Sequence, residues 1–174
     1  MSIKERDSQR SKLYKAEGVL RSRAARLETV PDIERFIAKV IARAPIQERY
    51  GRWLRTPIKV KDGRGRSNAG GHERYITMPL WSRTDHIVLH ELAHTLTRRK
   101  HGLDVAGHGW QYAAIYLDLV WFGMGREAHD VLKASFKAGK VRFAEPRKRA
   151  PLTDEAKAVL AGRLKTARDA RLAA

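Results

Sequence analysis

The feature that most constrains the fold of this chain is an apolar stretch over residues 87–96 that contains His90, Glu91 and His94. Its length and composition predict a buried helix. Two imidazoles and a carboxylate inside such a helix are costly to bury without a partner. A pair of satisfied core histidines beside a surface glutamate is the alternative, and this burial cost makes it the weaker one. The sequence therefore predicts that the three side chains serve a common ligand.

The spacing within this stretch indicates what the ligand is. His90 and His94 are four residues apart, so one helical turn separates them and both imidazoles can reach the same ion. Glu91 lies one step round the helix, where it can contact a water molecule held by that ion. Two ligands with a base beside them are the arrangement that a metallohydrolase needs.

A catalytic zinc ion usually has three protein ligands and one open position, so a third ligand is expected. The metzincin pattern requires a glycine and a histidine where this chain has Thr97 and Lys100, and that pattern is excluded. A glutamate on the following helix is also unsuitable. The nearest one, Glu127, lies 127 − 94 = 33 residues after His94 and beyond a glycine break.

His108 is the favoured third ligand. It stands between Gly107 and Gly109 at the start of a predicted helix, and the glycines allow this segment to approach the first helix closely. His101, which follows a basic run in an expected loop, and Asp104 are the alternatives.

Together these residues resemble the SprT-like zinc metallopeptidases. The pattern of that family is H-E-x-x-H followed by H-G-x-x-F or H-G-x-x-W. This chain has His90-Glu-Leu-Ala-His94 and then His108-Gly-x-x-Tyr112. The resemblance covers residues 57–122 and implies a zincin-like fold, a bound Zn²⁺ and peptidase activity. The chain departs from the family in having a tyrosine at the aromatic position and no cysteine-based zinc ribbon.

Two further segments carry resemblances. Ala69 followed by Ile76-Thr-Met78 is similar to the strand that lies beside the active-site helix in SprT-like proteins. The opening segment, Arg6-Asp-x-Gln-Arg10 and then Tyr14-x-Ala-Glu17, resembles a family of actinobacterial and actinophage metallohydrolases with no known substrate.

The predicted reaction follows from these assignments. Zn²⁺ would be bound by His90, His94 and His108, and Glu91 would act as the general base in hydrolysis of a peptide bond. An extended protein or peptide substrate could pair with an exposed strand over residues 75–78. The developing oxyanion needs a further donor. Four residues are candidates for it, and their spacing does not rank them: Tyr112, His101, His72 and Arg74.

The pattern of elements in the chain predicts an α+β fold, and the resemblance implies that this fold is zincin-like. A small antiparallel sheet is expected beside the active-site helix, with additional N- and C-terminal helices. Helices are predicted over residues 5–26, from Pro31 to a stop at Pro45, over 109–122 and 126–137, and after Thr153; strands are predicted over 58–61 and 75–80. Ser82 and Asp85 resemble a capping box before the active-site helix. The expected organisation is an N-terminal helical segment (1–55), a catalytic core (56–138), and a basic linker with a final helix (139–174).

The charge of the chain suggests a polyanionic partner. Its 174 residues include 36 Lys and Arg against 19 Asp and Glu, a net charge of +17. Residues 1–55 hold 14 against 7, or +7, and residues 141–174 hold 9 against 4, or +5. Non-specific nucleic-acid binding through these basic termini is the expectation. A solvated basic surface that reflects codon usage is the alternative.

Several classes of function are compatible with the sequence. The leading one is a zinc metallopeptidase, and the others are a nucleic-acid-associated regulatory protease, a non-enzymatic zinc-binding module, and amide or ester hydrolysis. The chain has no cysteine, which excludes thiolate chemistry. No signal-peptide core or bilayer-length apolar segment is visible, so a cytoplasmic protein without membrane contact is expected. No pattern indicates an oligomeric state.

Overall fold

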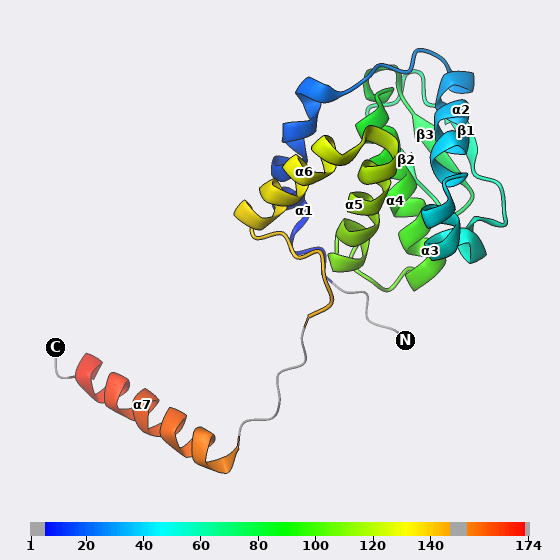
Figure 1. Ribbon diagram of the computed structural model, residues 1–174. Coiled ribbons are helices and arrows are strands. Elements are labelled where there is room, and N and C mark those ends of the chain that lie inside the picture. Colours follow the sequence, from blue (N-terminus) through cyan, green and yellow to red (C-terminus); the bar gives the residue numbers. More distant parts are fainter. Residues whose placement is uncertain (1–5, 147–152, 173–174) are drawn as a thin grey trace.

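The computed structural model describes residues 6–146 and 153–172 and shows an α+β fold (Figure 1). The α-helices are α1 (Arg10–Glu17), α2 (Val30–Ile41), α3 (Ala44–Leu54), α4 (Asp85–His101), α5 (Trp110–Met124), α6 (Arg126–Ala138) and α7 (Asp154–Leu172). The strands are β1 (Lys59–Asp62), β2 (Gly70–Gly71) and β3 (Tyr75–Met78), and the short 3₁₀ helices are η1 (Gly18–Arg23) and η2 (Leu80–Ser82).

The sheet is mixed, so the prediction of an antiparallel sheet was wrong. Its strand order is β1-β3-β2, with β3 parallel to β1 and antiparallel to β2. Asp62 and Gly63 are typical turn residues, but the chain does not return directly into a partner strand there. The chain instead runs on through residues 63–69 and reverses at residues 72–74, between β2 and β3. This hairpin occupies one edge of β3 and leaves the other edge to β1, which runs in the same direction as β3.

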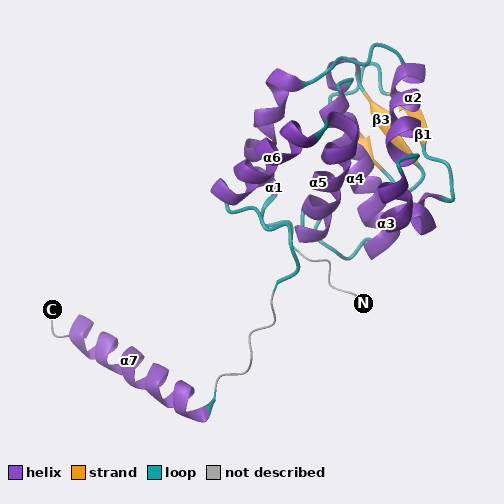
Figure 2. Ribbon diagram, viewed as in Figure 1, coloured by secondary structure: helices purple, strands orange, loops and turns teal. Residues whose placement is uncertain are grey.

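One hydrophobic core unites the helices of the N-terminal half with α4, α5 and α6, and its buried residues extend from Leu13 to Val141. Helix α4 packs along α5 and also contacts β2 and β3, while α2 contacts β1. Figure 2 shows the small sheet at one side of the molecule, next to α2 and α4. The helix that carries the histidine pair is therefore a buried central element, as its apolar sequence predicts.

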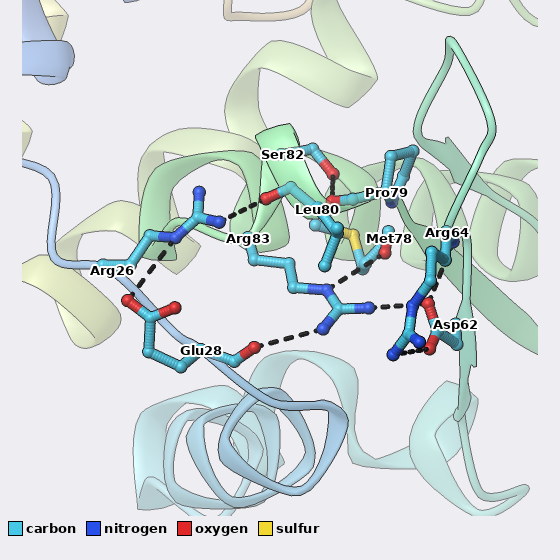
Figure 3. A network of polar contacts seen from close by, with 9 residues as sticks. All are labelled: Arg26, Glu28, Asp62, Arg64, Met78, Pro79, Leu80, Ser82 and Arg83. Carbon is cyan, nitrogen blue, oxygen red and sulfur yellow. Dashed lines mark hydrogen bonds and ion pairs between the residues drawn. The ribbon is translucent and has the colours of Figure 1, made fainter.

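The start of α4 is fixed by a buried arginine (Figure 3). Arg83 is 3% exposed, and its guanidinium donates to the backbone oxygens of Met78 at 3.3 Å and Glu28 at 3.1 Å. It also donates to Asp62 Oδ1 at 2.6 Å. These contacts join the end of β1, the end of β3 and the segment before α2 at one point. Such a network holds α4 at a defined position against the sheet.

Several predicted element boundaries differ from the observed ones. The single helix expected over residues 5–26 is α1 followed by η1. The next helix ends at Ile41, and Pro45 does not stop it but lies in the first turn of α3, where its fixed φ suits a helix start. Ser82 does not cap α4, because its hydroxyl donates to a carbonyl three residues earlier and α4 begins at Asp85.

Helix α7 confirms the predicted final helix, and Figure 1 shows it apart from the other helices. Its apolar side chains at Val159, Leu160 and Leu164 are exposed. Among the described residues, no helix combines the length and the apolar character needed to cross a membrane.

Candidate metal centre

Three imidazoles converge where α4 meets the start of α5. One ring nitrogen from each of His90, His94 and His108 lies within 4.8 Å of the other two, close enough to hold one metal ion. The first two histidines occupy successive turns of α4, and the third immediately precedes α5, which packs on α4. The alternatives for the third ligand, His101 and Asp104, are not part of this group.

Two carboxylates from the N-terminal segment hold the histidines in place. Glu17 Oε2 lies 2.8 Å from His90 Nδ1, and Asp7 Oδ2 lies 2.7 Å from His108 Nδ1. An imidazole that donates its Nδ1 proton to a carboxylate keeps the lone pair of Nε2 for a metal. His108 Nε2 is buried and has no hydrogen-bond partner, which is the state expected of a ligand atom. The chemistry of these side chains therefore fits a metal ion.

The protonation of the three imidazoles differs. Burial and the nearby charge of His90 hold the pKa of His94 well below its usual value. Burial also lowers the pKa of His108, although the hydrogen bond that it donates to Asp7 opposes this. Burial lowers the pKa of His90 as well, but the hydrogen bond and charge of Glu17 outweigh it and the net shift is upward. His94 and His108 thus favour the neutral form that binds metal, and a proton competes mainly at His90.

Glu91 lies beside the ligands and is 6% exposed. Burial raises its pKa, with the charge of His90 acting against this. The carboxylate is placed next to β2 because α4 and β2 approach very closely. A Cβ atom at Gly71 would lie 2.1 Å from the backbone oxygen of Glu91 and 2.8 Å from Cβ of His94, so only glycine permits this approach.

The histidine cluster opens into a cleft of about 380 Å³ that is lined by α1, β2, α4 and the segment before α5. The lining side chains include Arg10, Tyr14, His72 and Arg98. A second hollow of about 390 Å³ shares Arg10, Tyr14, His90 and Glu91 with the first and extends to Trp81 and Ile87. The two hollows therefore adjoin each other beside the histidine cluster.

The four predicted oxyanion donors are at different places. His72 lines the cleft. Tyr112 packs beneath the histidine rings, is completely buried, and donates its hydroxyl to the backbone oxygen of His90 at 3.3 Å. Arg74 lines a separate hollow, and His101 packs near Trp110 at the end of α4. The structure thus brings His72 to the cleft and gives Tyr112 a structural contact, and it leaves Arg74 and His101 away from the cluster.

Sequence reasoning did not assign roles to Asp7, Tyr14 or Glu17. The ring centroid of Tyr14 lies 5.0 Å from that of His108 and 5.6 Å from that of His90, and this tyrosine is 38% exposed. These side chains lie far from the histidines in the sequence. Glu17 and His90 are 73 residues apart, and Asp7 and His108 are 101 residues apart. The signal available was their joint occurrence in the opening segment that resembles a metallohydrolase family.

Comparisons of this chain with protein-family models, with curated proteins and with solved structures gave no match. The interpretation of the centre therefore depends on its residues and their geometry.

Proposed function

We propose that this chain is a zinc-dependent metallohydrolase, and specifically a metallopeptidase of the SprT-like, zincin type. The observation that carries the proposal is the convergence of three imidazole nitrogens beside the buried carboxylate of Glu91, in a cleft open to solvent. The ligand count favours catalysis over a structural role, because structural zinc sites are usually closed by four protein ligands. Asp7 and Glu17 do not supply a fourth, since they bind the other ring nitrogens.

In this proposal each residue has a separate task. His90, His94 and His108 would hold the zinc ion, which when bound supplies Lewis acidity and makes a nearby water more acidic. The carboxylate of Glu91 accepts a proton from the attacking water and delivers it to the leaving nitrogen. Its raised pKa suits this exchange, because a base works best when its pKa is near the operating pH. Tyr14 and His72 line the cleft and are the candidates for hydrogen bonds to the developing oxyanion.

A peptide is the substrate class that the cleft favours. The strand predicted to receive it, residues 75–78, lies in the middle of the sheet, and that prediction was wrong. Strand β2 is at the sheet edge, and residues 69–72 line the cleft. An extended chain could add to this edge and cross the metal centre. Hydrolysis of other amides or esters would use the same groups.

Elemental analysis and a cleavage assay on unfolded casein would test the proposal. His90→Ala, His94→Ala and His108→Ala should each lose zinc. Glu91→Gln should keep zinc and lose cleavage by at least about 100-fold, because it removes only the base. His101→Ala, a matched histidine outside the cluster, should keep both. Equal zinc loss in the Glu91→Gln variant, or cleavage that persists in it, would contradict these roles.

A further inference from the structure

Outside the metal centre, the described residues contain a hollow of about 330 Å³ that is lined mainly by arginines. It lies between the end of α3, the β2–β3 hairpin and α4. Arg52 and Arg55 come from the end of α3, Arg74 comes from the hairpin, and Arg98 comes from α4. We call these four residues the arginine pocket.

The four guanidinium groups bring their positive charges to one hollow. Within the described part of the chain, none of them forms an ion pair, although other arginines do, such as Arg49 with Asp118 at 2.6 Å. The lining includes one carboxylate, that of Glu73, which is exposed. Like charges gathered around one hollow repel each other, so a bound anion would relieve this repulsion.

The pocket has a preformed frame. Arg99, the next residue after Arg98, is turned toward the protein and donates from Nη1 to the backbone oxygens of Trp53 and Thr56, each at 2.8 Å. Its Nε also donates to the backbone oxygen of Glu73. These bonds tie the end of α3 to the hairpin. The arginines of the pocket are therefore presented by backbone segments whose separation is fixed.

The cations extend beyond the pocket along the neighbouring strands. Residues 52–74 contain seven Lys and Arg against two Asp and Glu, a net charge of 7 − 2 = +5. Lys61 Nζ lies 3.4 Å from the ring centroid of Tyr75, the residue after Arg74, and the ring of His72 stacks on Tyr75 at 4.4 Å. Cations near the exposed ring of His72 suit a ligand with repeated phosphates and planar bases.

We propose that the arginine pocket and the adjoining strand residues bind the phosphate backbone of a nucleic-acid strand. Arg98 lines both the pocket and the metal cleft, and His72 and Arg74 lie on the same hairpin, one facing each hollow. A bound strand would therefore pass next to the metal centre. This assignment does not depend on hydrolytic activity, and it places the polyanion contact in the folded domain instead of the basic termini.

Fluorescence anisotropy with a labelled oligothymidine and the full-length chain tests this proposal. The triple variant Arg52→Gln, Arg55→Gln and Arg74→Gln removes three exposed charges that make no hydrogen bond through their side chains among the described residues. Its affinity at low salt should fall by at least about tenfold, and the slope of log K against log salt should decrease by about 2. The matched variant Arg163→Gln, Lys165→Gln and Arg168→Gln on α7 removes the same charge and should change affinity less than about twofold.

The control measurements separate the remaining outcomes. Thermal unfolding and zinc content should be the same in both triple variants and the wild type, which shows that a loss of binding is not a loss of folding. No binding of oligothymidine, or a loss only in the α7 variant, would overturn the proposal. Equal affinity for polyglutamate, with the same loss in the pocket variant, would indicate an acidic protein surface instead. Binding of pyrophosphate as tight as that of oligothymidine would indicate a single-phosphate site and would also overturn it.

Discussion

At the scale of single residues, two carboxylates orient the histidines of the candidate metal centre without belonging to the ligand group. Glu17 and Asp7 accept hydrogen bonds from His90 and His108 and fix which ring nitrogen is free. Such partners typically contribute about 10- to 100-fold to metal affinity. We expect Glu17→Gln and Asp7→Asn each to weaken zinc binding by about this factor, measured by competition with a chromophoric chelator.

The control for this prediction is an acidic residue that forms a salt bridge away from the three histidines. Glu127 pairs with Arg23 on the surface, and Glu127→Gln should leave zinc affinity unchanged. Wild-type affinity in both Glu17→Gln and Asp7→Asn would show that these carboxylates have no influence on the centre.

The sequence predicts one part of this centre and not the other, for a physical reason. His90, Glu91 and His94 are related by helical periodicity, which is a local property, and the glycines around His108 limit where the next ligand can lie. The contacts of Glu17 depend on how α1 packs across the molecule, and no local pattern encodes that arrangement. Only the resemblance of the opening segment to a metallohydrolase family drew attention to it.

At the scale of elements, a buried amide adds to Asp7 and Glu17 in attaching the N-terminal segment to the histidine cluster. Gln9 donates from Nε2 to the backbone oxygen of His108 at 2.7 Å and to that of Arg142 at 3.0 Å, and its Oε1 accepts from the backbone N–H of Arg142 at 3.0 Å. One side chain thus joins the start of α1, the third histidine and the segment after α6. We expect Gln9→Ala to loosen the contacts that hold the start of α1, His108 and the segment after α6 together.

Hydrogen–deuterium exchange would measure this effect. Peptides covering residues 6–17 and 139–146 should exchange faster in Gln9→Ala than in the wild type, while those in α5 should not change. The free energy of unfolding should fall by about 1–3 kcal/mol, the usual cost of leaving buried polar groups unpaired. Ser11→Ala, a substitution at an exposed position of α1, provides the control. Unchanged exchange in both peptides would show that packing alone holds the segment.

The elements themselves were predictable to different degrees. Helix α4 follows from its apolar composition, and α2 follows from its period and from Pro31 in its first turn. The direction of β1 relative to β3 did not follow, because strand pairing is decided by where the chain reverses. That reversal occurs at residues 72–74, after a strand as short as Gly70–Gly71 that carries no apolar alternation.

At the scale of the whole molecule, metal binding and folding should be linked through pH. A ligand that binds only the folded state stabilises it by about 2.7 kcal/mol at 100 times its Kd. His94 and His108 have lowered pKa values, so they stay neutral below 6.5, the ordinary pKa of a histidine. The pKa of His90 is raised, so its proton competes with zinc already above pH 6.5. Zinc affinity should therefore begin to fall at a higher pH than for an ordinary imidazole.

In the metal-free protein, pH has the opposite effect on the contribution of His90 to stability. Because the folded-state pKa of His90 is raised, its contribution to stability is fully present below pH 6.5 and is lost as pH rises through the folded-state pKa. Acidification thus weakens zinc binding while this contribution to the metal-free fold increases.

The increase in Tm on adding zinc should shrink steadily from mildly alkaline pH to below pH 6.5. In Glu17→Gln, which removes the group that raises this pKa, the midpoint of that decline should move to lower pH. A zinc-induced increase in Tm that is constant across this range would contradict the assignment of His90 as a ligand.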